Sequence, residues 1–200
     1  EQFHQNVYLI DDPVEVPQDT VRFEHNRGDS PEVLWFGHPD HWHHVDFLKE
    51  VLSHADFQSY KLRTISRHPE ATHQWDPKSV WENARHSDIA VIPCDVDATS
   101  QSKSSNRLTA LMSLGYPVIA SPIPSYQKFI AHGDNGFLAT SIEQWREYLQ
   151  ELRKPERRLE MSQEALKTPE LKMISLPNVA KQWERLFEQL ISNASKYCDR

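Results

Sequence analysis

The sequence lacks the features that mark a membrane protein or a disulfide-stabilised scaffold. Its 200 residues include only two cysteines, Cys94 and Cys198, so neither a disulfide framework nor a cysteine-based metal site follows. No apolar run approaches the ~20 residues that a membrane-spanning helix needs, and no signal-peptide pattern is present. We therefore expect a reducing compartment and a cytoplasmic location.

Positive charge is also scarce. The 22 Lys and Arg residues are outnumbered by 29 Asp and Glu residues, which gives a formal net charge of −7. This balance argues against a nucleic-acid partner, because a phosphate backbone needs a broad basic surface. A small anionic ligand remains possible, since a few local Lys and Arg side chains suffice to bind one phosphate group.

An initial methionine is absent as well, and the chain begins at Glu1. We read this as a fragment or a processed product of a longer polypeptide. Its length allows one domain with a substantial core.

Strand and helix patterns alternate along the chain. Apolar or alternating runs predict strands at 32–36, 60–65, 88–93 and 117–120, and helical spacing predicts helices at 41–54, 77–86, about 104–115, and about 178–195. This order predicts an α/β fold, a Rossmann-like parallel sheet with helices on both faces. We divide the chain into a 1–31 entry segment with a short strand at 7–10, a 32–177 domain, and a 178–200 helix. That helix is expected to bury Val179, Trp183, Leu186, Phe187 and Leu190.

In such a sheet, ligands bind at the carboxyl ends of the strands. The most informative segment there is the loop after the strand at 88–93 and the helix start that follows it. A helix N-terminus attracts phosphate through its unpaired N–H groups, and basic side chains flank this one. The candidate ligand-binding residues are Asp95, Lys103, Ser104, Ser105, Asn106 and Arg107. Taken by itself, the spacing slightly favours an ordinary N-cap with solvated basic neighbours.

A family resemblance favours the binding interpretation. Residues 87–93, the helix start at 103–107, and the stretches 111–121, 132–139 and 143–152 resemble the C-terminal, donor-binding domain of GT-B glycosyltransferases of the family 4 (group 1) type. These stretches follow one another in the family's order and cover about a third of the chain.

The resemblance implies a domain that binds a nucleotide-diphosphate sugar, such as a UDP- or GDP-sugar, for metal-independent glycosyl transfer. It implies no cofactor and no catalytic residue within this chain, because the acceptor is held by an N-terminal domain of the parent chain. The resemblance is also compatible with peripheral membrane association of the parent chain. One departure matters: many members hold the donor ribose with a Glu at the position of Ala110. A non-catalytic scaffold or a sugar-nucleotide epimerase of the same fold therefore remains an alternative.

Other cleft loops contribute further candidates. Trp75 lies where the family borders the nucleobase, so it could stack on the base, although core packing is the commoner role of a tryptophan. Arg67 follows a predicted strand and is a second candidate phosphate contact. Gly37 and His38 occupy the family's first cleft loop, which approaches the donor phosphates.

Histidines crowd that first loop. His38, His41, His43 and His44 lie together with Asp40, a spacing that invites a metal-site interpretation. Without a cysteine cluster, a solvated helix end is the simpler interpretation. From the sequence we expect no metal here.

Overall fold

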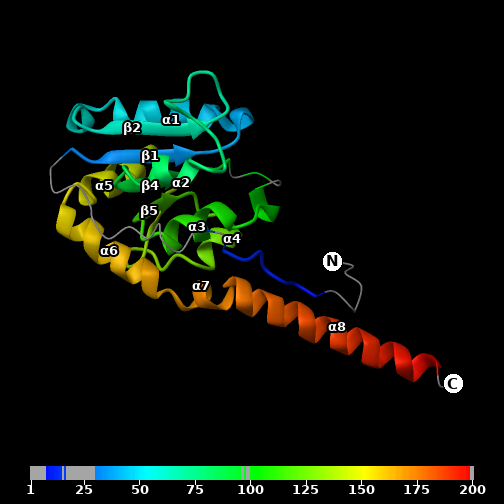
Figure 1. Ribbon diagram of the computed structural model, residues 1–200. Coiled ribbons are helices and arrows are strands. Elements are labelled where there is room, and N and C mark those ends of the chain that lie inside the picture. Colours follow the sequence, from blue (N-terminus) through cyan, green and yellow to red (C-terminus); the bar gives the residue numbers. More distant parts are fainter. Residues whose placement is uncertain (1–7, 15, 17–29, 96, 98–99, 199–200) are drawn as a thin grey trace.

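A single parallel sheet forms the centre of the molecule. The computed structural model describes residues 8–14, 16, 30–95, 97 and 100–198, with side chains described except at 101 and 193–198. The sheet has six strands in the order β3-β2-β1-β4-β5-β6, and every neighbouring pair is parallel (Figure 1). The strands are β1 (Glu32–Phe36), β2 (Lys61–Ser66), β3 (His73–Gln74), β4 (Ile89–Ile92), β5 (Val118–Ala120) and β6 (Phe137–Leu138). The strand order reverses direction between β1 and β4, which is the switch point of a doubly wound fold.

Helices connect the strands and follow the last one. They are α1 (His43–Leu52), α2 (Val80–Ala84), α3 (Asn106–Ser113), α4 (Pro124–Gln127), α5 (Ile142–Glu151), α6 (Pro155–Lys167), α7 (Pro169–Met173) and α8 (Leu176–Cys198). Short 3-10 helices are η2 (Pro39–His41), η3 (Ala55–Phe57) and η4 (Ser100–Ser102).

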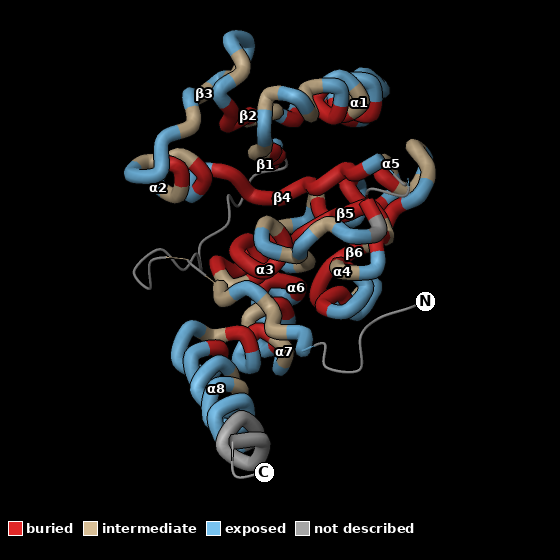
Figure 2. The backbone as a smooth tube through the Cα atoms, turned by 90° about the vertical axis from the view of Figure 1, so that its right-hand side faces the viewer, coloured by how far each residue is buried: buried red, intermediate tan, exposed pale blue. Residues whose placement is uncertain are grey.

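Each face of the sheet has its own apolar core. Along β1, Leu34 belongs to one buried cluster, and Val33 and Trp35 belong to the other, because successive strand side chains point to opposite faces. The first cluster includes side chains of α2, α3 and α4, whereas the second includes those of α1 and α5. Strands β4 and β5 are accordingly buried throughout, and β1 is buried between its two end residues (Figure 2). The predicted Rossmann-like α/β fold, a parallel sheet with helices on both faces, is confirmed.

The end of α3 shows how sequence sets an element boundary. Gly115 adopts φ 79°, a left-handed conformation that favours glycine. Its N–H donates to Met112 O, and the N–H of Tyr116 donates to Leu111 O, the paired bonds of a Schellman motif. The chain is thereby turned directly into β5, whose carboxyl end reaches the same edge as β4.

Two local predictions are wrong. A strand was predicted at 7–10, but residues 8–10 form none, and Val7 lies outside the described residues. This part of the chain is attached in another way: Val14 N–H donates to Ile174 O, and the side chains of Ile10, Val14 and Val16 pack on the first core cluster. The helix predicted at 77–86 begins only at Val80, because a turn closed by the bond from Ser79 N–H to Asp76 O precedes it.

The last helix is longer than predicted and its apolar side is not covered. Of the residues expected to be buried, Val179 is buried and Leu186 is half-buried, but Trp183, Phe187 and Leu190 are 46%, 54% and 48% exposed. The reason is visible in Figure 1, where α8 extends away from the sheet and only its first turn lies near the body. None of the described helices is long and apolar enough to cross a membrane.

Candidate functional site

A pocket lies at the carboxyl edge of the sheet, beside the switch point between β1 and β4. It encloses about 520 Å³, within the usual range for small-molecule sites. The loops after β1, β2 and β3 and the start of α3 all contribute to its wall. Eight of the ten residues predicted to bind the donor line it: Gly37, His38, Arg67, Trp75, Lys103, Ser104, Asn106 and Arg107. Ser105 and Asp95 do not.

The pocket is locally positive although the chain is acidic. Arg67, Lys103 and Arg107 line it, and its lining residues include no carboxylate. Among the described residues, the Lys103 ammonium has no hydrogen-bonding or ion-pair partner. These charges are arranged for an anion.

Arg107 is held in place by the backbone of β1. It is the second residue of α3, and its Nη1 donates to Phe36 O at 3.1 Å. A Cβ on Gly37 would lie 3.1 Å from the same Nη1 and 2.7 Å from the Trp35 ring. Glycine at this position therefore allows the guanidinium and the indole to approach the end of β1.

Trp75 and Arg67 form a cation–π pair. The guanidinium carbon of Arg67 lies 4.9 Å from the centroid of the Trp75 ring. Trp75 is only partly buried: it packs on the first core cluster and also lines the pocket. The sequence offered two interpretations of Trp75, core packing and stacking on a ligand. Its position is compatible with both.

Other predicted residues make hydrogen bonds with nearby residues or make no capping bond. Ser105 is the N-cap position of α3 but makes no side-chain capping bond, and Asn106 Nδ2 donates to Asp12 Oδ2 at 3.0 Å. His38 is exposed, and its Nδ1 accepts from Asp40 N–H at 3.4 Å. Ala110, where the family's Glu is absent, borders an adjoining cavity of about 360 Å³ together with Asp12, and this cavity shares Phe36, Asn106 and Arg107 with the pocket.

Sequence reasoning missed four pocket residues: Phe36, Pro39, His41 and Tyr126. Tyr126 is the buried residue of α4. Burial raises the pKa of its hydroxyl to about 12, so it stays protonated at neutral pH, and it accepts a bond from Cys94 Sγ at 3.8 Å. The signal available in the sequence was its position just after β5, at the same edge as the other loops.

Asp95 faces histidines rather than the pocket. Its carboxylate lies 2.9 Å from His43 Nε2 and 3.4 Å from His44 Nε2. The hydrogen bond with His43 lowers the pKa of Asp95. Burial lowers the pKa of His44 to about 4, and burial together with Lys103 and Arg107 lowers that of His41.

No protein-family model and no curated protein sequence matches the chain. Several solved structures are similar to it. The sucrose-phosphate synthase of Thermosynechococcus elongatus aligns with a TM-score of 0.64 at 16% identity, over 82% of this chain and 46% of its own. WaaG, a glycosyltransferase involved in lipopolysaccharide biosynthesis, aligns with a TM-score of 0.61 at 16% identity, over 81% and 53%.

A further similar structure is a mutant of S. aureus TarM in complex with Fondaparinux, alpha-GlcNAc-glycerol and UDP. It aligns with a TM-score of 0.69 at 13% identity, over 92% of this chain and 40% of its own. The chain thus spans about half, or less, of the length of the proteins that it matches. At these identities the likeness establishes the fold: this chain has the Rossmann-like α/β fold found in GT-B glycosyltransferases.

Proposed function

We propose that this chain is the donor-binding domain of a glycosyltransferase and binds a nucleotide-diphosphate sugar. The observation that carries the proposal is the pocket at the switch point, where Arg67, Lys103 and Arg107 converge without a carboxylate among the lining residues. A diphosphate carries the charge that this arrangement suits. The shared fold of sucrose-phosphate synthase, WaaG and TarM supports the same assignment.

The pocket suggests a role for each part of the ligand. Lys103 and Arg107 contact the diphosphate, one as a point charge and the other as a planar fork, beside the free N–H groups of the first turn of α3. Gly37 and His38 border the same phosphates. The nucleobase stacks on the Trp75 ring, which lines the pocket and has the Arg67 guanidinium 4.9 Å from its centroid.

Sugar transfer then proceeds without a metal at the phosphates. As the bond to the diphosphate breaks, negative charge develops on the leaving group, and fixed cations stabilise that charge. The acceptor and any general base come from a partner domain, which accords with the chain spanning 37–53% of the similar glycosyltransferases. The exposed apolar side of α8 at Trp183 and Phe187 is the surface that we assign to that partner.

Calorimetric titration of the 200-residue chain tests the proposal. UDP and GDP are titrated separately, with uridine and guanosine as controls that lack the diphosphate. Saturable binding of one diphosphate, with much weaker binding of its nucleoside, supports the donor site. Absence of binding by both diphosphates would favour the alternative of a non-catalytic scaffold, for which the missing Glu at Ala110 is the best argument.

Replacing Trp75 with alanine is expected to weaken binding of the preferred nucleotide about five- to tenfold. An aromatic side chain contributes roughly 1–3 kcal/mol by stacking on a base, and Arg67 already occupies part of this ring, so the lower end applies. Trp75→Phe should retain most of the affinity. Trp183→Ala, on the distant α8, is the matched control; an equal loss in that variant would count against stacking.

The chain alone is expected to transfer no sugar. A donor enclosed from one side lacks the positioning that a second domain provides, and positioning contributes several kcal/mol to such reactions. The assay uses UDP-, GDP- and dTDP-sugars with candidate acceptors, first with this chain and then with the longer protein. Sustained turnover by the chain alone would contradict the need for a partner domain.

A further inference from the structure

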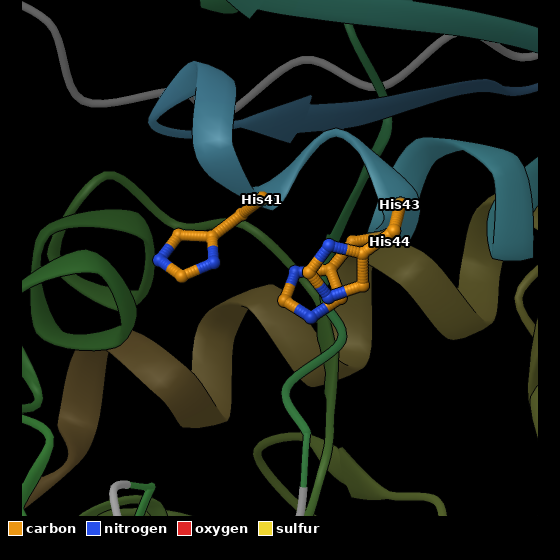
Figure 3. Close-up of side chains that lie close together, drawn as sticks. All are labelled: His41, His43 and His44. Carbon is orange, nitrogen blue, oxygen red and sulfur yellow. The ribbon is translucent and has the colours of Figure 1, made fainter.

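Three imidazoles converge where η2 meets α1. His41, His43 and His44 each place one ring nitrogen so that these three atoms all lie within 4.8 Å of one another. Figure 3 shows the three rings on the same side of the turn. The rings of His43 and His44 have centroids 4.2 Å apart, and those of His41 and His44 are stacked with centroids 5.5 Å apart. This is the cluster that the sequence suggested and that we interpreted as a solvated helix end.

His44 does not fit that interpretation. Its side chain is only 4% exposed. Within the described part of the chain its Nδ1 has no hydrogen-bond partner, and the nearest partner of its Nε2 is Asp95 Oδ2 at 3.4 Å, a long contact. A buried polar group without a hydrogen bond is costly, and nearly all such groups in proteins have a partner. A bound cation would give this imidazole the bond that it lacks.

Asp95 completes the set from a second element. Ligand atoms bound to zinc at about 2.0–2.2 Å in a tetrahedron lie about 3.3–3.6 Å from each other. Asp95 Oδ2 lies 2.9 Å from His43 Nε2 and 3.4 Å from His44 Nε2, close to those edges. His41 is half-buried, and one of its ring nitrogens lies within 4.8 Å of those of His43 and His44.

We propose that His41, His43 and His44, together with Asp95, bind a divalent transition-metal ion, with zinc as the favoured occupant. Imidazole nitrogen and one carboxylate oxygen are zinc ligands, and four protein ligands make a closed, structural site. The positive charges of Lys103 and Arg107 oppose a cation here, and the Asp95 carboxylate offsets them in part. The ion joins the η2–α1 turn to the loop after β4 at the same edge of the sheet, and one of its ligands, His41, also lines the pocket.

The experiment is a titration of the chelator-stripped 200-residue chain with zinc chloride, followed by calorimetry and thermal unfolding. One zinc ion per chain and a rise in Tm are expected, since a ligand that binds only the folded state stabilises it. Cobalt(II) serves as a spectroscopic probe: intense visible absorption indicates a tetrahedral site, whereas the weak spectrum of an octahedral ion would contradict the proposed ligand set. These readouts do not involve nucleotide, so the site stands or falls separately from the donor pocket.

Variants identify the ligands. His41→Gln, His43→Gln and Asp95→Asn are each expected to lower zinc affinity at least about tenfold, because even outer-shell partners of a metal contribute that much. His54→Gln is the matched control: its Nδ1 lies 3.3 Å from Asp56, an exposed pair away from the cluster, so affinity should be unchanged. His44 is left intact because its burial makes a substitution hard to interpret. No saturable zinc binding by the chain, or equal affinity in all four variants, would overturn the proposal.

Discussion

Replacing Lys103 or Arg107 with alanine is expected to weaken the binding of a nucleoside diphosphate by about 10- to 150-fold. In the proposed complex each side chain donates to a charged phosphate, and such hydrogen bonds contribute roughly 1.5–3 kcal/mol. Both residues line the pocket at the start of α3, and Lys103 has no competing side-chain partner among the described residues. Affinities for UDP and GDP measured by calorimetry at fixed salt concentration give the result directly.

A conservative change at Arg107 is expected to lose only part of the affinity. Arg107→Lys keeps the charge but loses the fork that also donates to Phe36 O, so we expect an affinity between those of the wild type and Arg107→Ala. Lys49→Ala on α1 is the control, because Lys49 is exposed and paired locally with Asp46. Far-UV circular dichroism and thermal unfolding establish that each variant is folded. Wild-type affinity in both alanine variants would show that the diphosphate does not bind in this pocket.

Much of the fold could be predicted because its elements are strongly patterned. The strand at β4 is apolar at every position and buried on both faces, as parallel strands are. The Gly115 stop and the Ser141 cap, whose Oγ accepts from Gln144 N–H, mark helix ends by local chemistry alone. Alternation of these elements leaves few topologies, and a doubly wound parallel sheet is the common one.

The prediction failed where burial depends on distant contacts. Trp183 and Phe187 have the spacing of a buried helix face, but no described part of the chain covers them. Periodicity identifies a face and cannot identify what packs against it. For the same reason, the 7–10 segment has strand-like residues although the described part of it, residues 8–10, forms no strand.

The candidate site followed from topology more than from motifs. The rule that ligands bind at the carboxyl ends of parallel strands brought Arg67, Trp75 and Lys103 to one pocket, although 36 residues in the chain separate the first from the last. The same rule misplaced Asp95, which turns toward His43 instead. Side-chain direction at a strand end depends on its neighbours from other elements, and here that neighbour is His43, 52 residues earlier in the chain.

A charged residue that looks like a surface residue in the sequence is central to packing. Arg158, in the first turns of α6, is fully buried. Its Nη1 donates to Leu152 O at 2.8 Å and to Arg153 O at 2.6 Å, the carbonyls at the end of α5. A cation at a helix C-terminus also interacts favourably with the helix dipole. Arg158 thus links the C-terminal end of α5 to the start of α6 by hydrogen bonds.

Replacing Arg158 with alanine is expected to lower the free energy of unfolding by about 3 kcal/mol, because at least two charge-assisted hydrogen bonds are lost and a cavity remains. Arg158→Met fills most of that cavity without restoring the bonds, so it should recover part of the loss. Lys167→Ala on the same helix, exposed and paired with Glu164, should change stability by less than about 0.5 kcal/mol. Urea unfolding followed by circular dichroism measures all three, and an Arg158→Ala loss no larger than that of Lys167→Ala would mean that the α5–α6 junction does not depend on this side chain.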